Sequence, residues 1–275
     1  EGRGSVLFGV TVTGGWWEGD PFSFQDGGAI FVDRGCSPWI VCCRIEGNQG
    51  GAGGGVFSWL ASPRVESCIF VENHAVGGGG MASDGGDPEV VHCVFIENTA
   101  QRGGGLALWN TGANVESTVF AINEAVGLGG AVSASDGHVT LTNCTLYANF
   151  GGAIASVFNS HVDLRNSLVC FNWPVHATHC EHSGTIHAQC TNVYGNMLGD
   201  WTNCLSGQDG AEGNVCSDPA FCSPNPVRDM DWSIRDDSPC APDVSGCGLI
   251  GAEGVGCYGT PCEQVSWGEL KARFR

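Results

Sequence analysis

A motif of about 25 residues repeats along most of this 275-residue chain, and it constrains the fold more than any other feature of the sequence. Two successive copies are VESCIFVENHAVGGGGM, which begins at Val65, and VVHCVFIENTAQRGGGL, which begins at Val90. An asparagine ends the pattern Cys/Thr/Ser-x-apolar-x-x-Asn in each copy, and the step from one asparagine to the next is nearly constant along the chain. These asparagines are Asn48, Asn73, Asn98, Asn123, Asn149, Asn172 and Asn196. The chain is therefore expected to stack repeated structural units.

Within each copy the spacing of apolar residues is that of a β-strand. Cys68 and Phe70 are two residues apart, which places both side chains on one face of a strand. The glycine-rich segments exclude a helix. Val65 and Cys68 are three residues apart, so both can point inward only if the chain bends between them. Each repeat is thus predicted to contain several short strands separated by corners.

A unit of this size cannot bury its apolar face alone, whereas coils stacked at the strand spacing of about 4.8 Å pair every strand with its equivalents. We therefore predict an all-β fold, a right-handed parallel β-helix (solenoid) of about 25 residues per coil and about eight coils, over residues 1–201. Gly54 and Gly55 and their equivalents suit a corner that needs positive φ or close backbone approach. The asparagines suit another corner, where they tolerate the left-handed region and their amides can form a ladder from coil to coil.

The composition limits the partners and the compartment. Asp and Glu number 29 against 11 Lys and Arg, which disfavours nucleic acid as a partner. No apolar run is long enough to span a membrane.

Sixteen cysteines without a Cys-x-x-Cys pair indicate an oxidising compartment and a secreted or cell-surface protein. Since the first residues lack the pattern of a signal peptide, we expect that a signal was removed or that residues upstream of Glu1 belong to the gene product. We expect Cys43, Cys68, Cys93 and Cys144 to stack as small apolar side chains inside the solenoid.

Two motifs carry a resemblance to known proteins. Gly-Gly-Ala-Ile occurs at 27–30 and 151–154, and Phe-x-x-Asn occurs at 70–73 and 95–98. The combination resembles the secreted bacterial right-handed parallel β-helix repeat proteins and is similar to the repeats of chlamydial polymorphic outer-membrane proteins. The likeness covers about residues 5–262 and implies the fold, but not one function, because the β-helix carries lyases, adhesins and structural fibres alike.

Cysteine and proline become frequent after Asn196, and the repeat fades. We predict a disulfide-rich C-terminal cap at 202–262. The sequence does not determine the pairing, and our provisional pairs are Cys180 with Cys190, Cys204 with Cys216, and Cys222 with Cys240.

Residues 263–275 form a short amphipathic tail in this interpretation. Trp267, Leu270 and Phe274 are spaced as one apolar stripe of a helix. The tail could fold back over the last coil or serve as a linker. Alternatively, it could bind the open sheet edge near Val6–Val12 of another copy and so join subunits head to tail into a fibre.

Groups suited to catalysis are few, and we expect no catalytic residues. Asp163 and Arg165 would share the outer face of a strand, but no neighbouring Asp or Lys obviously joins them. Glu46, Glu72 and Glu97 would stack near the asparagine corner, either solvated or bridged by a cation such as calcium.

We expect no cofactor, and the one run that suggests a metal contains His176, His179, His182 and His187 beside Cys180. Residues three apart do not share a face of a strand, which argues against that site. Trp16, Trp17, Trp59 and Trp109 could stack on sugars, although Trp59 and Trp109 could equally cover loop corners.

Two functions remain. The first is an extracellular or cell-surface, non-catalytic structural or adhesive solenoid, which could assemble with itself or bind a surface glycan. The alternative is a carbohydrate-binding or polysaccharide-degrading, lyase-like β-helix.

Overall fold

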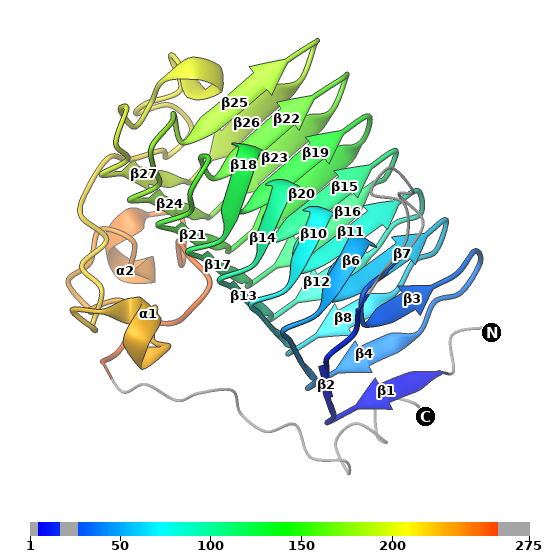
Figure 1. The fold of residues 1–275 in the computed structure, drawn as a ribbon. Coiled ribbons are helices and arrows are strands. Elements are labelled where there is room, and N and C mark those ends of the chain that lie inside the picture. The colour runs from blue at the N-terminus through cyan, green and yellow to red at the C-terminus, as the bar shows by residue number, and fades with distance from the viewer. Residues whose placement is uncertain (1–4, 17–26, 258–275) are drawn as a thin grey trace.

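The chain forms a solenoid whose coils stack into parallel sheets (Figure 1). A computed structural model describes residues 5–16 and 27–257. We name the sheets A to D; they contain eight, eight, seven and four strands in the described residues. About seven complete coils are therefore present, and sheets A and B each carry an eighth strand. The predicted all-β parallel solenoid with a repeat of about 25 residues is confirmed.

Sheets A and B form two sides of each coil. Sheet A contains β1 (Val6–Phe8), β4 (Trp39–Val41), β8 (Arg64–Glu66), β12 (Glu89–Val91), β16 (Ala113–Glu116), β20 (His138–Thr142), β23 (His161–Arg165) and β26 (Thr185–Gln189). Sheet B contains β2 (Thr11–Thr13), β5 (Arg44–Glu46), β9 (Ile69–Val71), β13 (Val94–Ile96), β17 (Val119–Ala121), β21 (Thr145–Tyr147), β24 (Leu168–Cys170) and β27 (Asn192–Tyr194).

Sheet C follows sheet B along the chain, and a strand of sheet D lies between them in four of the coils. Sheet D contains β6 (Gln49–Ala52), β10 (His74–Gly77), β14 (Thr99–Arg102) and β18 (Glu124–Leu128). Sheet C contains β3 (Ile30–Val32), β7 (Val56–Trp59), β11 (Met81–Asp84), β15 (Leu106–Trp109), β19 (Val132–Ser135), β22 (Ile154–Val157) and β25 (Thr178–Glu181). Within the described part of the chain, three short helices follow the strands: the 3₁₀ helix η1 (Asn203–Leu205), α1 (Pro226–Asp229) and α2 (Pro242–Ser245).

Residues in the left-handed region turn the chain at the corners of each coil. In one coil these residues are His92 after β12, Glu97 after β13, Gly103 after β14 and Asn110 after β15. The expected bend between Val65 and Cys68 is at Ser67, which has a φ of 53°. The side chains of Val65 and Cys68 are both fully buried. The odd spacing in the sequence is thus explained by a corner.

The asparagine corner differs from our expectation in one respect. The residue before each asparagine adopts the left-handed conformation, as Glu72 does with a φ of 52° and Glu97 with a φ of 55°; neither Asn73 nor Asn98 has a positive φ. Because the preceding residue makes the turn, the asparagine side chain points into the interior, where Asn73 is 0% exposed. The prediction that the asparagines adopt the left-handed conformation was therefore wrong, because the residue before each asparagine adopts it.

Apolar columns fill the interior of the solenoid. Phe70, Phe95 and Phe120 stack with ring centroids 4.4 and 4.9 Å apart. The cysteines expected inside the coils are buried free thiols: Cys43, Cys68, Cys93 and Cys144. The Sγ atom of Cys68 accepts a hydrogen bond from the backbone N–H of Cys43 at 3.4 Å, so the column also satisfies backbone donors.

The C-terminal region closes one end of the solenoid and also covers its side. Leu205 of η1 is fully buried against the main core. Trp232 packs with Ile96, Val119 and Ala121, whose strands belong to sheet B. Figure 1 shows α1 and α2 alongside the sheet B strands rather than stacked beyond the last coil. None of the helices in the described residues is long and apolar enough to cross a membrane.

Three disulfides among residues 27–257 secure this region, but the pairs differ from those we expected. The bonds are Cys180–Cys204, Cys190–Cys247 and Cys222–Cys257. The provisional pairs Cys180–Cys190, Cys204–Cys216 and Cys222–Cys240 are therefore wrong. Because the C-terminal region folds back along the coils, it brings cysteines together that are up to 57 residues apart in sequence.

Candidate functional site

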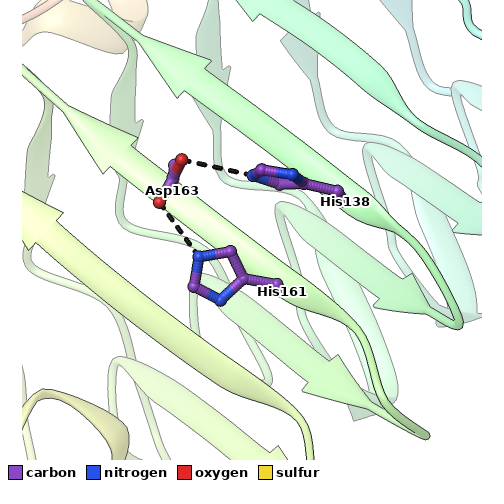
Figure 2. Close-up of side chains that lie close together, drawn as sticks. All are labelled: His138, His161 and Asp163. Atoms are coloured by element: carbon purple, nitrogen blue, oxygen red, sulfur yellow. Dashed lines mark hydrogen bonds and ion pairs between the residues drawn. The ribbon is translucent and has the colours of Figure 1, made fainter.

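Two histidines and an aspartate meet on the outer face of sheet A. His138 and His161 occupy paired positions on the neighbouring strands β20 and β23, and Asp163 is two residues after His161. The Nε2 atom of His138 is 3.2 Å from Oδ2 of Asp163, and Nε2 of His161 is 3.1 Å from Oδ1. Figure 2 shows both rings directed toward the carboxylate. Alternation along the strands places these groups outward, because Val139 and Val162 between them point into the core.

Further charged groups surround this cluster. Arg165 donates from Nη2 to Oδ2 of Asp163 at 2.7 Å. His187 on β26 is paired with Asp163, and its Nδ1 is 3.9 Å from Oδ1 of that carboxylate. On its other side, His187 Nε2 is 3.3 Å from Glu212. The sequence prediction that Asp163 and Arg165 share an outer face agrees with this geometry, but it did not include His161 on the same strand or His138 on the adjoining coil.

The Asp163 carboxylate is held in its charged form. Burial on its own raises the pKa of this carboxyl, but the hydrogen bond from His138 and the nearby Arg165 and His161 outweigh burial and leave the pKa below its ordinary value. A carboxylate with a lowered pKa is a poor proton donor near neutral pH. It is well suited to hold a cation.

The histidines singled out in the sequence do not converge. His176 Nδ1 is hydrogen-bonded to the Thr202 hydroxyl at 3.0 Å. His179 Nε2 is 2.8 Å from Glu181, and His182 Nδ1 is 3.8 Å from the same carboxylate. Cys180 is in a disulfide and so offers no thiolate. Within residues 5–16 and 27–257, the group of three whose ligand atoms all lie within 4.8 Å of one another is His138, His161 and Asp163.

The asparagine row forms a continuous interior ladder. Asn98 illustrates it: its Nδ2 donates to Oδ1 of Asn123 at 2.9 Å, and its Oδ1 accepts from Nδ2 of Asn73 at 2.9 Å. Asp200 ends the ladder by accepting from Nδ2 of Asn196 at 2.9 Å. The members are buried, so they stabilise the corner and offer no surface to a ligand. The ladder consists of Asn48, Asn73, Asn98, Asn123, Asn149, Asn172 and Asn196.

The three glutamates expected near this corner do not all share one position. Glu72 and Glu97 are exposed and lie at equivalent corners of neighbouring coils. Glu46 is instead paired with Val71, one position earlier in the coil. The expected stack of three glutamates was therefore wrong.

The apolar residues predicted for the C-terminal tail, Trp267, Leu270 and Phe274, lie outside the described residues.

A groove lies on the other side of the coils, over sheets C and D. It has a volume of about 520 Å³, and its walls combine one aromatic ring with polar side chains. The lining residues are Val76, Gly77, Asp84, Gln101, Arg102, Trp109, Asn110 and Ser135. The Trp109 ring crosses Gly77 so closely that a Cβ there would lie 2.5 Å from it. Asn110 donates to Asp84 Oδ1 at 3.0 Å, which leaves the second carboxylate oxygen for other contacts.

Comparison with models of known protein families identifies the family of this chain. The model of the right-handed β-helix region matches residues 9–169, which is more than half of the chain. Neither the curated proteins nor the solved structures gave a match. The match agrees with the parallel coils and with the handedness predicted from the sequence. This chain belongs to the right-handed β-helix family.

Proposed function

We propose that the protein is an extracellular, non-catalytic adhesive solenoid that binds a surface glycan in the groove beside Trp109. The groove is the observation that carries this proposal, because it places an aromatic ring among hydrogen-bonding side chains on paired strands. The backbone of a strand is held more precisely than that of a loop, so the side chains that bind the glycan would be preorganised.

The chemistry of the groove suits a sugar. A pyranose ring presents C–H groups on its faces, which pack on an aromatic surface, and hydroxyls around its rim. Trp109 could provide that surface, and Asp84, Gln101 and Arg102 could bond to hydroxyl groups. A volume of about 520 Å³ falls in the usual range for small-ligand sites, about 300–1,000 Å³. We therefore infer a short glycan segment as the ligand class.

The non-catalytic part of the proposal is supported by the state of Asp163. Its lowered pKa and its contact with Arg165 favour a permanent anion rather than a group that exchanges protons. One observation favours the alternative of a polysaccharide-degrading enzyme: Asp163, two histidines and an arginine lie together on an exposed sheet face. If the protein cleaves a glycan there, Asp163→Asn should abolish cleavage while Trp109→Ala should leave the cleavage step intact.

An extracellular location is part of the proposal. Three disulfides stabilise the C-terminal region, and such bonds persist in oxidising compartments. The motifs shared with secreted bacterial β-helix proteins support the same assignment. Cell-surface exposure would place the groove where it can meet glycans.

Replacing Trp109 with alanine is expected to weaken glycan binding at least tenfold. The ligand would first be found on a glycan array, and its dissociation constant then measured by titration calorimetry. Arg102→Ala should weaken binding by several fold, because Arg102 is exposed and lines the same groove. Trp16→Ala is the matched control, since Trp16 is 67% exposed and does not line the groove. Equal affinity in all three variants, or no binding to any glycan, would contradict the proposal.

We also propose that the solenoid can assemble head to tail. Strands β1 and β2 stand at the ends of sheets A and B, and each is paired with one strand only among the described residues. The backbone at the end of a sheet can add a strand from another chain. The occupant proposed for it is the tail with Trp267, Leu270 and Phe274 from a second copy.

Deleting residues 263–275 is expected to abolish concentration-dependent assembly. Sedimentation velocity and electron microscopy would compare the full chain with the deletion variant. Fibres that persist without the tail would exclude this mechanism, as would a full chain that stays monomeric at high concentration.

A further inference from the structure

We propose that His138, His161 and Asp163 form a zinc site on the outer face of sheet A. The proposal is independent of glycan binding, since the three residues lie on β20 and β23 and none of them lines the groove. It also differs from the run of His176, His179 and His182, which the structure does not bring together.

The spacing of the ligand atoms fits a tetrahedral ion. With zinc at about 2.0–2.1 Å from each ligand, two ligand atoms in tetrahedral geometry are about 3.3 Å apart. The two nitrogen-to-oxygen distances are close to that value, 3.2 Å from His138 to Oδ2 and 3.1 Å from His161 to Oδ1, and each nitrogen faces a different oxygen of the Asp163 carboxylate. One ligand atom from each of the three residues lies within 4.8 Å of the other two, so one ion between them is within reach of all three side chains.

The backbone beneath the site is regular. Strands β20 and β23 are paired at five successive positions, from His138 with His161 to Thr142 with Arg165. The site is therefore fixed by a ladder of backbone hydrogen bonds rather than by a loop. The imidazoles are on the exposed surface, where an ion can enter and retain a bound water.

Contacts around the ligands are compatible with a cation. The Nδ1 atom of His161 is 2.7 Å from the Thr185 hydroxyl. In the tautomer that donates Nδ1–H to that hydroxyl, the Nε2 lone pair is available to a metal ion, whereas in the other tautomer Nε2–H donates to the Asp163 carboxylate. His187 is beside Asp163 and Glu212 is beside His187, so an imidazole is close enough to serve as a fourth ligand with a carboxylate to orient it.

The ligand set selects the class of metal. Calcium and magnesium prefer oxygen ligands throughout, whereas two imidazoles and one carboxylate bind zinc and other first-row transition metals. The net charge of −18 also raises the local concentration of cations near the protein. Zinc binding should therefore exceed calcium binding at this site.

Arg165 should affect zinc affinity in the opposite direction from the three ligands. Its guanidinium is 2.7 Å from Oδ2 of Asp163 and so competes with the ion for the carboxylate. Removing that positive charge should strengthen zinc binding, whereas removing a ligand should weaken it. A group of residues that only stabilised the fold would not give these opposite signs in metal affinity.

The test is titration of the chelator-treated full chain with Zn²⁺ by calorimetry, with Co²⁺ absorption as a report of ligand geometry. We expect one ion per chain, a dissociation constant at least tenfold weaker in His138→Gln and Asp163→Asn, and tighter binding in Arg165→Gln. His74→Gln is the matched control, because His74 is also exposed on a strand and its Nδ1 also contacts a threonine hydroxyl, that of Thr99 at 2.7 Å. Circular dichroism would establish that each variant is folded.

Several outcomes would overturn the proposal. They are no Zn²⁺ binding by the folded chain, unchanged affinity in His138→Gln, or an equal loss in His74→Gln. A loss in His179→Gln with none in His138→Gln would place the site on β25 instead and would equally refute it. Glycan binding by the Trp109 variants is a separate readout, so failure of one proposal leaves the other testable.

Discussion

The Gly79→Ala variant is expected to lose at least about 3 kcal/mol of stability or to fail to fold. A Cβ at Gly79 would lie 2.5 Å from the carbonyl oxygen of Gly104 and 2.6 Å from that of Thr99. These are backbone atoms of the next coil, and that coil is itself held by its neighbours. The added carbon can be accommodated only by separating two coils, which would break hydrogen bonds such as that from Gly79 N to Gly103 O at 3.2 Å.

Chemical denaturation followed by circular dichroism would measure the effect. Gly254→Ala is the matched control, because a Cβ there meets no atom within 4 Å and its φ is outside the left-handed region. Its free energy of unfolding should change by no more than about 0.5 kcal/mol. Similar midpoints for the two variants would show that the close approach of coils has been misjudged.

Asn98→Ala is expected to lower the free energy of unfolding by about 3–5 kcal/mol. The substitution removes four hydrogen bonds in the buried ladder: Oδ1 accepts from N and Nδ2 of Asn73, and Nδ2 donates to Phe70 O and Asn123 Oδ1. The groups left behind are too deeply buried for water to replace the lost partners.

Asn114→Ala provides the comparison for this variant. Asn114 is the same residue type on the neighbouring coil, but its side chain is exposed on β16. Its loss should cost less than about 0.5 kcal/mol. Urea denaturation of both variants would decide, and a loss for Asn98→Ala no greater than that for Asn114→Ala would mean that the ladder contributes little.

The coils could be predicted from the sequence because the same pattern of buried residues and corners recurs in each repeat. Burial at Cys68 and Phe70, the bend at Ser67 and the position of Asn73 all follow from spacing within one repeat, and each recurs in the next repeat. Repetition lets weak local signals reinforce one another.

The C-terminal region lacks such a period, and neither its position along sheet B nor its disulfide pairing was predicted. A signal for its position was nevertheless present. Val94, Phe95 and Ile96 form a continuous apolar run, as expected for a strand buried on both faces. Phe95 fills the core, while Val94 and Ile96 contact the cluster that contains Trp232.

The histidine and aspartate cluster was missed for a related reason. The step from His138 to His161 is shorter than that of most coils, so the two histidines do not align when one constant period is imposed on the whole chain. The step from Asn149 to Asn172 is shortened in the same way, and following it would have aligned them. The groove beside Trp109 has no comparable signal, since its walls combine residues from several strands of sheets C and D.

The most direct test of the central claim measures binding and cleavage of the same glycan in one experiment. The full chain would be incubated with the glycan that it binds most tightly, and affinity and the release of new chain ends would be followed together. The account predicts saturable binding that depends on Trp109, with no product above the buffer control. Turnover at an enzyme-like rate, lost in Asp163→Asn, would contradict it.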